Sequence, residues 1–340
     1  MPESTVFPAS VSVIGAGSWG TALAALLAAK RPVTLWCREP EVAESIREFR
    51  HNPLFVSEFT LPPNLHATTD LAEAARAPLL VMAPPAQFTR SMLAALLPLL
   101  TPETAFVSVS KGIEVENLTL ISQMYDQVLG VEWARRTFCC LSGPSFARDV
   151  LRGLPTAVVA ASANLTLAEE VQRLFHAPSF RTYRTDDVVG VELGGALKNV
   201  IAIAAGISDG LGFGASARAA LVTRGLAEMI RLGARLGGKA ETFAGLSGLG
   251  DLLLTSGDDM SRNRTVGKRL GAGEPPEAIL TGSREVAEGV KTAQAVHRLA
   301  GREGVEMPIC RAVHDILYQR HSPREAVRRL MERELKAENA

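Results

Sequence analysis

The 340-residue sequence predicts an α/β protein, with an N-terminal Rossmann-type doubly wound sheet followed by an all-α C-terminal domain. In the first half, short apolar runs alternate with helical patterns, which is typical of a parallel sheet covered by helices on both faces. From about Asp187 the strand-like runs stop and helical patterns follow one another. A chain of this length commonly forms two domains, which we expect at residues 1–187 and 188–340.

The expected elements are bounded by Gly and Pro residues. The predicted strands are Val11–Ile14, Val33–Trp36, Leu79–Ala83, Ala105–Val109, Phe138–Leu141 and Ala157–Ala161. The predicted helices of the second half are Val188–Ile207, Ala215–Leu236, Glu241–Leu249, Arg262–Leu270, Val290–Arg302 and Met307–Tyr318. The first of these helices is long and apolar enough to span a membrane, but Glu192, Lys198 and Asn199 would be costly in lipid. We therefore expect a buried core helix and no stable membrane insertion.

Composition narrows the class of protein further. The sequence has 36 basic residues (lysine and arginine) and 36 acidic residues (aspartate and glutamate). Its net charge is therefore zero, which does not favour a nucleic-acid partner. The first ten residues do not have the pattern of a signal peptide. The cysteines show no C-x-x-C pairing and the six histidines show no metal-like spacing, so we expect no metal site and a cytoplasmic location. The expected buried thiols are Cys37, Cys139, Cys140 and Cys310.

The strongest single motif follows the first strand. Residues 15–20, Gly-Ala-Gly-Ser-Trp-Gly, have G-x-G-x-x-G spacing between a strand and a helix. Gly15 permits the tight turn, Gly17 lets the backbone approach a pyrophosphate, and Gly20 allows close helix packing. The helix N-terminus then faces the anion. A purely structural glycine-rich turn is the alternative, but the position of the motif favours dinucleotide binding.

Two charged residues after the second strand bear on the choice of dinucleotide. Arg38 can pair with the 2′-phosphate of NADP, whereas Glu39 can bind the free ribose of NAD. Both can also be solvated loop charges. We expect NADP or NAD as the cofactor, with NADPH slightly favoured.

Catalytic candidates lie at two kinds of position. Lys111, Gly143 and Ser145 follow predicted strands, at the edge of the sheet where this fold places function, although loop residues there can also be merely solvated. Lys198 lies in a helix that is apolar on nearly every face, where a lysine is rarely buried unless it is paired or functional. Burial lowers a lysine pKa toward neutrality, which suits a general acid or base. The alternative is a lysine that reaches the surface or forms a structural pair.

A basic helix start predicts an anion site. Ser261 is the expected N-cap, which places Arg262 and Asn263 in a first turn whose amides favour a phosphate. Arg264, and with it Lys268 and Arg269, are expected on a solvated face of this helix.

Several motifs in order resemble bacterial NAD(P)-dependent glycerol-3-phosphate dehydrogenases over essentially the whole chain. These motifs are residues 15–24, 110–112, 142–147, 193–200, 248–252 and 261–263. The resemblance implies reversible hydride transfer between NAD(P)H and dihydroxyacetone phosphate, giving glycerol 3-phosphate for glycerophospholipid synthesis. It also implies that Lys198 is the proton acceptor during oxidation. A homodimer through the helical domain is expected from the family and from the prevalence of two-fold oligomers.

The same resemblance implies the ligand contacts. The implied cofactor residues, with the motif glycines Gly15, Gly17 and Gly20, are Ser18, Trp19, Arg38, Lys111, Ala147, Arg262, Val286 and Glu288. The implied substrate residues are Lys111, Gly143, Ser145, Lys198, Asp251, Ser261, Arg262 and Asn263. The loop at Pro84-Pro85 departs from the family, whose members usually have Ser at the second position, and it is left out of the site. Two alternatives remain open, a related two-domain dehydrogenase acting on another small hydroxy acid and a non-catalytic nicotinamide-binding sensor.

Overall fold

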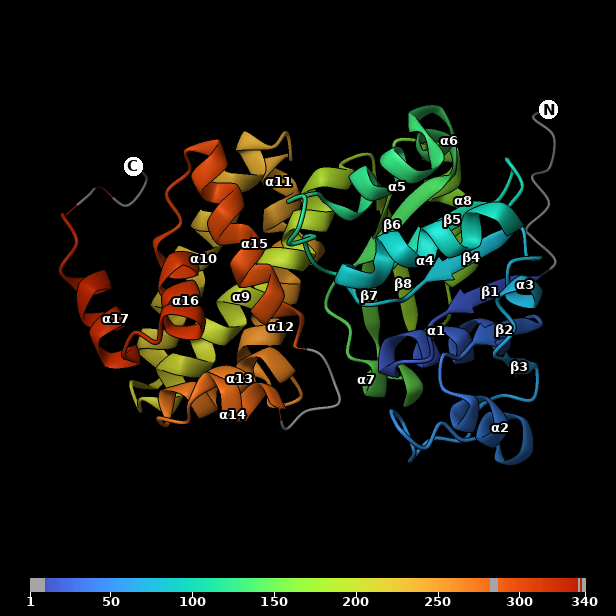
Figure 1. The fold of residues 1–340 in the computed structure, drawn as a ribbon, viewed down its shortest axis with the longest axis horizontal. Coiled ribbons are helices and arrows are strands. Elements are labelled where there is room, and N and C mark those ends of the chain that lie inside the picture. Colours follow the sequence, from blue (N-terminus) through green and yellow to red (C-terminus); the bar gives the residue numbers. More distant parts are fainter. Residues whose placement is uncertain (1–9, 282–286, 336, 338–340) are drawn as a thin grey trace.

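The computed structural model describes residues 10–281, 287–335 and 337. Its sheet-containing half and its helical half lie side by side (Figure 1). The strands are β1 (Val11–Ile14), β2 (Val33–Trp36), β3 (Leu65–Thr68), β4 (Leu79–Met82), β5 (Ala105–Ser108), β6 (Phe138–Ser142), β7 (Thr156–Ala161) and β8 (Phe180–Thr185). They form one sheet in the order β3-β2-β1-β4-β5-β6-β7-β8. Every neighbouring pair is parallel except β6 and β7, so the predicted fold class is confirmed, with one antiparallel pair added.

Helices cover both faces of the sheet because alternate strand residues point to opposite sides. Val81 of β4 packs into the core under α1, α2 and α8, whereas its neighbours Leu80 and Met82 pack into the core under α3, α4, α5 and α6. The helices of this half are α1 (Ser18–Ala28), α2 (Pro40–Phe49), α3 (Leu71–Ala74), α4 (Thr89–Leu96), α5 (Ile121–Leu129), α6 (Val131–Thr137), α7 (Ala147–Leu151) and α8 (Leu165–Phe175), with short 3₁₀ turns η1 (Ala86–Phe88) and η2 (Leu97–Leu99). All four cysteines are free and buried, as predicted.

The helical half is built around α9 (Val188–Gly210), which packs against α10, α12, α13 and α15. Among the described residues α9 alone is long and apolar enough to cross a membrane, and 89% of its most apolar window is buried inside the protein. It is therefore the core helix that the sequence predicted. The remaining helices are α10 (Gly214–Arg235), α11 (Ala240–Ala244), the π-helical turn η3 (Leu246–Gly250), α12 (Asp251–Gly257), α13 (Arg262–Gly271), α14 (Pro276–Thr281), α15 (Glu288–Glu303), α16 (Pro308–Gln319) and α17 (Pro323–Met331).

One predicted helix is wrong in detail. The pattern at Glu241–Leu249 forms α11, which ends at Ala244, and then the π-helical turn η3. Gly245 separates them, since its extended backbone (φ −90°, ψ −160°) ends the regular helix. At Gly248 an added Cβ would lie 2.1 Å from the Phe243 carbonyl oxygen, so the turn has no room for a side chain there. This turn leads directly into α12 and places Asp251 at the start of that helix.

Candidate functional site

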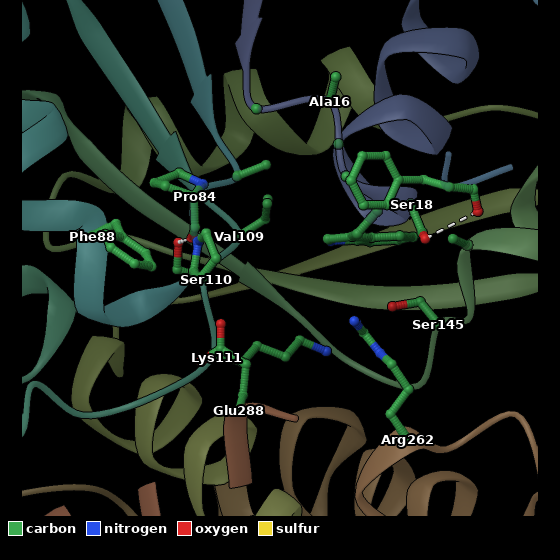
Figure 2. Close-up of a pocket in the computed structure, with 18 of the residues that line it drawn as sticks. Ala16, Ser18, Pro84, Phe88, Val109, Ser110, Lys111, Ser145, Arg262 and Glu288 are labelled. Carbon is green, nitrogen blue, oxygen red and sulfur yellow. Dashed lines mark hydrogen bonds between the residues drawn. The ribbon is translucent and has the colours of Figure 1, made fainter. Parts of the chain in front are cut away.

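A cleft of about 710 Å³ lies between the two halves. Its walls are the glycine-rich loop after β1, the loops after β4 and β5, and the starts of α7, α13 and α15. Figure 2 shows Ser18 and Ser145 on the sheet side, with Arg262 projecting toward them from the helical side. The cleft therefore lies at the carboxyl edge of the parallel strands, where the sequence predicted the site.

The glycine-rich loop has the geometry of a pyrophosphate cradle. Gly15 has φ +113°, and a Cβ at Gly20 would lie 2.0 Å from the Gly15 carbonyl oxygen, so both positions require glycine. Apart from its chain neighbours, no atom of the described residues lies within 4 Å of a Cβ built at Gly17, so the backbone there is open to the cleft. The N-cap residue of α1 is Gly17, which has no side chain to cap the helix, so this N-terminus suits an anion.

A second loop closes over this cradle. The buried Asn52 Nδ2 donates to the Ala16 carbonyl oxygen at 2.8 Å and to Thr21 Oγ1 at 2.9 Å. Ser18 Oγ donates to the Phe55 carbonyl oxygen at 3.3 Å (Figure 2). Trp19 lines the cleft, and its buried Nε1 has no hydrogen-bond partner among the residues that the structure describes. An unpartnered buried donor at this position fits a bound dinucleotide.

The two candidate ribose residues pair with each other. Arg38 Nε and Nη2 donate to Glu39 Oε1 at 2.9 and 2.6 Å, and both residues line the cleft. The Arg38 side chain is 77% exposed and that of Glu39 only 22%, so the guanidinium can leave its partner at little cost. The end of β2 thus offers both a cation and a carboxylate to a ribose.

The far end of the predicted cofactor site is formed by Glu288, the first residue of α15. Its carboxylate accepts the backbone N–H of Ala86 at 3.2 Å and so joins the two halves. Burial raises the pKa of Glu288 to about 7. Ala147 also lines the cleft, whereas Val286 lies outside the described residues.

A buried charge cluster forms the floor of the cleft. Lys198 Nζ on α9 donates to Asp251 Oδ1 at 2.6 Å and to Thr255 Oγ1 at 2.7 Å. Lys111 Nζ donates to the other oxygen of the carboxylate, Asp251 Oδ2, at 2.6 Å. The predicted Lys198 is therefore buried and paired with a carboxylate that it shares with a second lysine.

The protonation of this cluster is set by burial and by the shared carboxylate. Burial lowers the pKa of Lys198 to about 8, and the opposing effect of Asp251 is partly offset by the positive charges of Lys111 and Arg262. Burial alone would raise the pKa of Asp251, but the two lysines hold it below its usual value. Lys198 can thus exchange a proton near neutral pH while Asp251 stays ionised.

The remaining predicted substrate residues surround this cluster. Lys111 Nζ also donates to the Gly143 carbonyl oxygen at 3.1 Å, and Ser145 Oγ donates to the same oxygen at 3.0 Å. Ser145 and Lys111 line the cleft, whereas Gly143 and Asp251 lie behind them. The loops after β5 and β6 are thereby joined to α12.

The start of α13 has the N-cap that the sequence predicted. Ser261 is its N-cap and accepts the Arg264 backbone N–H at 3.2 Å. Asn263 is fixed on both sides, since its Nδ2 donates to Asn199 Oδ1 and its Oδ1 accepts the Gly289 N–H, each at 2.9 Å. Ser261, Arg262 and Asn263 all line the cleft.

The expectation that Arg264 lies on a solvated face is wrong. Its side chain is 8% exposed, its Nε and Nη2 donate to Asp209 Oδ2 at 2.9 and 2.6 Å, and it also pairs with Asp259. A buried guanidinium needs such partners, and they come from α9 and from the loop before α13.

Sequence reasoning missed three polar residues of the site. Asn199 and Thr255 line the cleft, and Asn52 supports the glycine-rich loop. The sequence could have indicated Asn199, because it is adjacent to the candidate Lys198. It could not have indicated Asn52, because the Asn52-Pro53 pair predicts only a turn. The loop at Pro84-Pro85, omitted from the predicted site, also lines the cleft. In the part of the chain that the structure describes, no group of three or more His, Cys, Asp or Glu side chains is arranged to hold a metal.

Comparison with known proteins gives the same family along the whole chain. Residues 10–168 match the family described as NAD-dependent glycerol-3-phosphate dehydrogenase N-terminus, and residues 187–328 match the corresponding C-terminus family. The glycerol-3-phosphate dehydrogenase [NAD(P)+] of Geobacter sulfurreducens is 56% identical over 330 residues, which cover 96% of this chain and 98% of that protein.

Solved structures agree with the sequence matches. Glycerol-3-phosphate dehydrogenase from Coxiella burnetii is similar with a TM-score of 0.92 at 38% identity, covering 96% of this chain and 100% of that chain. A ketopantoate reductase from Ralstonia eutropha has a TM-score of 0.59 at 15% identity, covering 94% of this chain and 99% of that chain. The second likeness shows a common fold only.

Proposed function

The chain belongs to the NAD-dependent glycerol-3-phosphate dehydrogenase family, and from this premise we propose that its cleft interconverts dihydroxyacetone phosphate and glycerol 3-phosphate. One observation carries the proposal. Lys198, buried on Asp251, lies on the floor of a cleft whose walls are a dinucleotide cradle and the basic start of α13. A proton donor, a cofactor site and a phosphate site are thus combined in one cavity.

The residues of the cradle fit a nicotinamide dinucleotide. The backbone at Gly17 and the N-terminus of α1 would hold the pyrophosphate, and Arg38 or Glu39 would hold the ribose. We propose that NADPH is slightly favoured, because Arg38 is far more exposed than Glu39 and suits a 2′-phosphate. When bound in its reduced form, the dinucleotide supplies the hydride.

Lys198 would act on the oxygen at C2. In its protonated form it would donate a hydrogen bond to the carbonyl and then transfer its proton to the developing alkoxide. In the reverse direction neutral Lys198 would accept the proton of the hydroxyl group. Asp251 and Thr255 hold the Nζ in place, and Lys111 neutralises the second oxygen of Asp251.

The substrate phosphate would lie at the start of α13. Arg262 offers a fork of donors, and Ser261 and Asn263 line the same wall of the cleft. Ser145 faces Arg262 from the sheet side (Figure 2). Binding energy from the phosphate would orient C2 against Lys198.

The proposal is tested by adding dihydroxyacetone phosphate to the purified protein with NADPH, and separately with NADH, and following the loss of absorbance of the reduced cofactor. We expect oxidation with the phosphorylated ketone and none with pyruvate or ketopantoate. Turnover with one of those two acids instead would identify a different dehydrogenase, and cofactor binding without turnover on any of the three would indicate a sensor.

The variant Lys198→Ala tests the proposed role of this residue. It should reduce kcat by roughly a hundredfold or more, since general acid–base catalysis contributes about that much. NADPH affinity, measured by fluorescence titration, should stay close to the wild-type value. Loss of both activity and cofactor binding would instead assign Lys198 a structural role.

Four further properties belong to the proposal. We propose domains at 1–187 and 188–340, because β8 ends at Thr185 and α9 begins at Val188. A homodimer through the helical domain, a cytoplasmic location and a role in glycerophospholipid synthesis follow from the resemblance to the bacterial enzymes. Analytical ultracentrifugation of the purified protein tests whether it is a homodimer. The lipid composition of cells depleted of the protein tests the role in glycerophospholipid synthesis.

A further inference from the structure

The segment between β5 and α5 connects the two halves of the molecule. Lys111 near its start reaches along the floor of the cleft toward the helical half (Figure 2). Two residues later, Ile113 is fully buried in the hydrophobic core of the helical half, and Leu120 at the end of the segment is buried in the same core. A loop of the sheet half is therefore inserted into the other half, with Lys111 at the point of entry.

Glu114 is the polar centre of this segment. It is 6% exposed, and its carboxylate accepts hydrogen bonds from Thr119 Oγ1 at 2.7 Å and Asn117 Nδ2 at 2.9 Å. Its backbone N–H donates to the Thr119 carbonyl oxygen at 3.0 Å. These bonds close the loop on itself around a buried negative charge. They also hold Leu118 at φ +55°, a conformation that a leucine rarely adopts.

Arg90 on α4 neutralises that charge in a bidentate ion pair. Its Nε donates to Glu114 Oε1 at 2.6 Å and its Nη2 to Glu114 Oε2 at 2.8 Å. A side-chain hydrogen bond from Arg90 is the main reason that the pKa of Glu114 falls to about 2. Arg90 Nη2 also donates to Gln127 Oε1 on α5 at 2.7 Å, so one guanidinium fixes the loop to both helices beside it.

Hydrogen bonds with Gln87 and Arg298 also support the segment. Gln87 Nε2 donates to the Ile113 carbonyl oxygen at 2.8 Å and its Oε1 accepts the Val115 N–H at 3.0 Å. From the helical half, Arg298 donates to the Val115 carbonyl oxygen at 2.6 Å. Of these supports only the Arg90–Glu114 pair is charged on both sides. Glu114 is buried while Arg90 is 29% exposed, so removing Arg90 would leave an uncompensated negative charge inside the loop.

We infer that Arg90 and Glu114 are a positioning pair that holds the 111–120 segment so that the Lys111 ammonium stays on Asp251, and that they thereby set the proton affinity of Lys198. This inference rests on the proposed function. Neither residue lines the cleft, so both act through Lys111. When the pair is broken, the segment shifts, Lys111 leaves the carboxylate, and the full charge of Asp251 acts on Lys198 alone. The neighbouring positive charge that disfavours protonated Lys198 is then also lost.

The experiment measures kcat against pH, in both reaction directions, for Arg90→Met, Arg90→Lys and Glu114→Gln. We expect kcat to fall by roughly ten- to a hundredfold in Arg90→Met, the range that a displacement of about 1 Å at a catalytic group can cause. The pH midpoint of kcat should move upward by about one unit, since an unshared carboxylate favours the charged lysine. Arg90→Lys, which keeps the charge but loses the fork, should lie between Arg90→Met and the wild type.

A matched control is available on α17. Arg328 forms a bidentate pair with Glu325 at 2.9 and 2.6 Å, on the exposed surface of the helical half and outside the cleft. Arg328→Met should leave kcat and its pH midpoint at the wild-type values. The control thus separates the loss of an arginine–glutamate pair as such from the loss of this particular pair.

The outcomes distinguish the inference from the proposed function. A wild-type protein that does not reduce dihydroxyacetone phosphate overturns the proposed function. An active wild type whose Arg90→Met variant has a lower melting temperature but an unchanged pH midpoint overturns the inference, because the pair then only stabilises the fold. Should Arg90→Met not fold, Glu114→Gln decides by the same measurement, since it removes the charge while keeping the shape of the side chain.

Discussion

At the scale of single residues, the proposed site places two lysines on one carboxylate. Asp251 accepts Lys198 on one oxygen and Lys111 on the other, so Lys198 lacks the undivided partner that would hold its proton firmly. Burial then lowers the pKa of Lys198 to about 8, well below its ordinary value of 10.5. A lysine of this kind can donate and accept a proton under the same conditions, as a reversible dehydrogenase requires.

This pKa predicts opposite pH dependences for the two directions. Oxidation of glycerol 3-phosphate needs neutral Lys198, so its kcat should rise with pH and level off above about pH 8. Reduction of dihydroxyacetone phosphate needs protonated Lys198, so its kcat should be constant at lower pH and fall above about pH 8. Initial rates measured across neutral and alkaline pH check both. Profiles that rise together or fall together would contradict the assignment of Lys198 as the proton carrier.

The adjacent Arg38 and Glu39 predict a change in cofactor preference. In Glu39→Ala the guanidinium loses its 2.6 Å partner and is fully available to a 2′-phosphate, while the acceptor for a free ribose is gone. The ratio of kcat/KM for NADPH to that for NADH should rise by up to about fivefold, the effect expected of an exposed ion pair. Glu39 makes no side-chain cap to α2, so the substitution should not disturb that helix. Glu41→Ala on α2 is the control. An unchanged ratio of kcat/KM for the two cofactors in Glu39→Ala would show that Glu39 does not bind the ribose.

At the scale of elements, the sequence predicted those with a strong local signal. The six predicted strands are confirmed within one or two residues, but β3 and β8 were missed. Both are the edge strands of the sheet, and β8 alternates buried and exposed residues, with charged Arg181 and Arg184 among the exposed ones. An edge strand buries less apolar surface than a central strand, so its pattern is weaker. Helices α12 and α14, with 7 and 6 residues, were missed because they have too few turns to establish a period. Helix α17 was missed because Ala326 is its one buried residue, so it has little of the buried apolar stripe of a core helix.

The prediction of the site was likewise limited to features with a strong local signal in the sequence. The glycine motif, Lys198 and the start of α13 could be proposed because each is recognisable within about ten residues of sequence. Thr255 and Asn52 were not, because their roles depend on contacts with Lys198 and Ala16, from which they are 57 and 36 residues distant in the chain. The burial of Arg264 was missed for a similar reason, since one of its carboxylate partners, Asp209, lies on α9. Chemistry that is local in sequence could be predicted, whereas support from distant elements could not.

At the scale of the whole molecule, the two halves are joined by polar contacts as well as by the inserted 111–120 segment. Glu192 on α9 accepts the Ser122 backbone N–H at 2.8 Å and the Ser122 hydroxyl at 2.7 Å, which fixes the core helix of one half to α5 of the other. Lys198 lies on the same helix as Glu192. The position of Lys198, the proposed catalytic residue, relative to the glycine-rich loop therefore depends on this junction.

The buried carboxyl of Glu192 makes this junction sensitive to pH. Burial raises its pKa from 4.5 to about 7, so between these values the native protein keeps a proton that the unfolded chain releases. Stability from this group is complete below pH 4.5 and is lost as pH rises through about 7, with a total change of roughly 3 kcal/mol. The variant Glu192→Gln cannot lose that proton and should not show this loss.

We therefore expect the free energy of unfolding of the wild type, relative to Glu192→Gln, to be lower at about pH 8 than at about pH 5. Urea titrations of both proteins at the two pH values measure the difference. Glu288, whose pKa is also raised to about 7, is present in both proteins, so its effect cancels in the comparison. Glu44→Gln, on the exposed face of α2, controls for removing a carboxylate from the surface. The free energies of unfolding of the wild type and Glu192→Gln could instead differ by the same amount at both pH values. Glu192 would then be ionised at both, and a permanent negative charge would hold the two halves together.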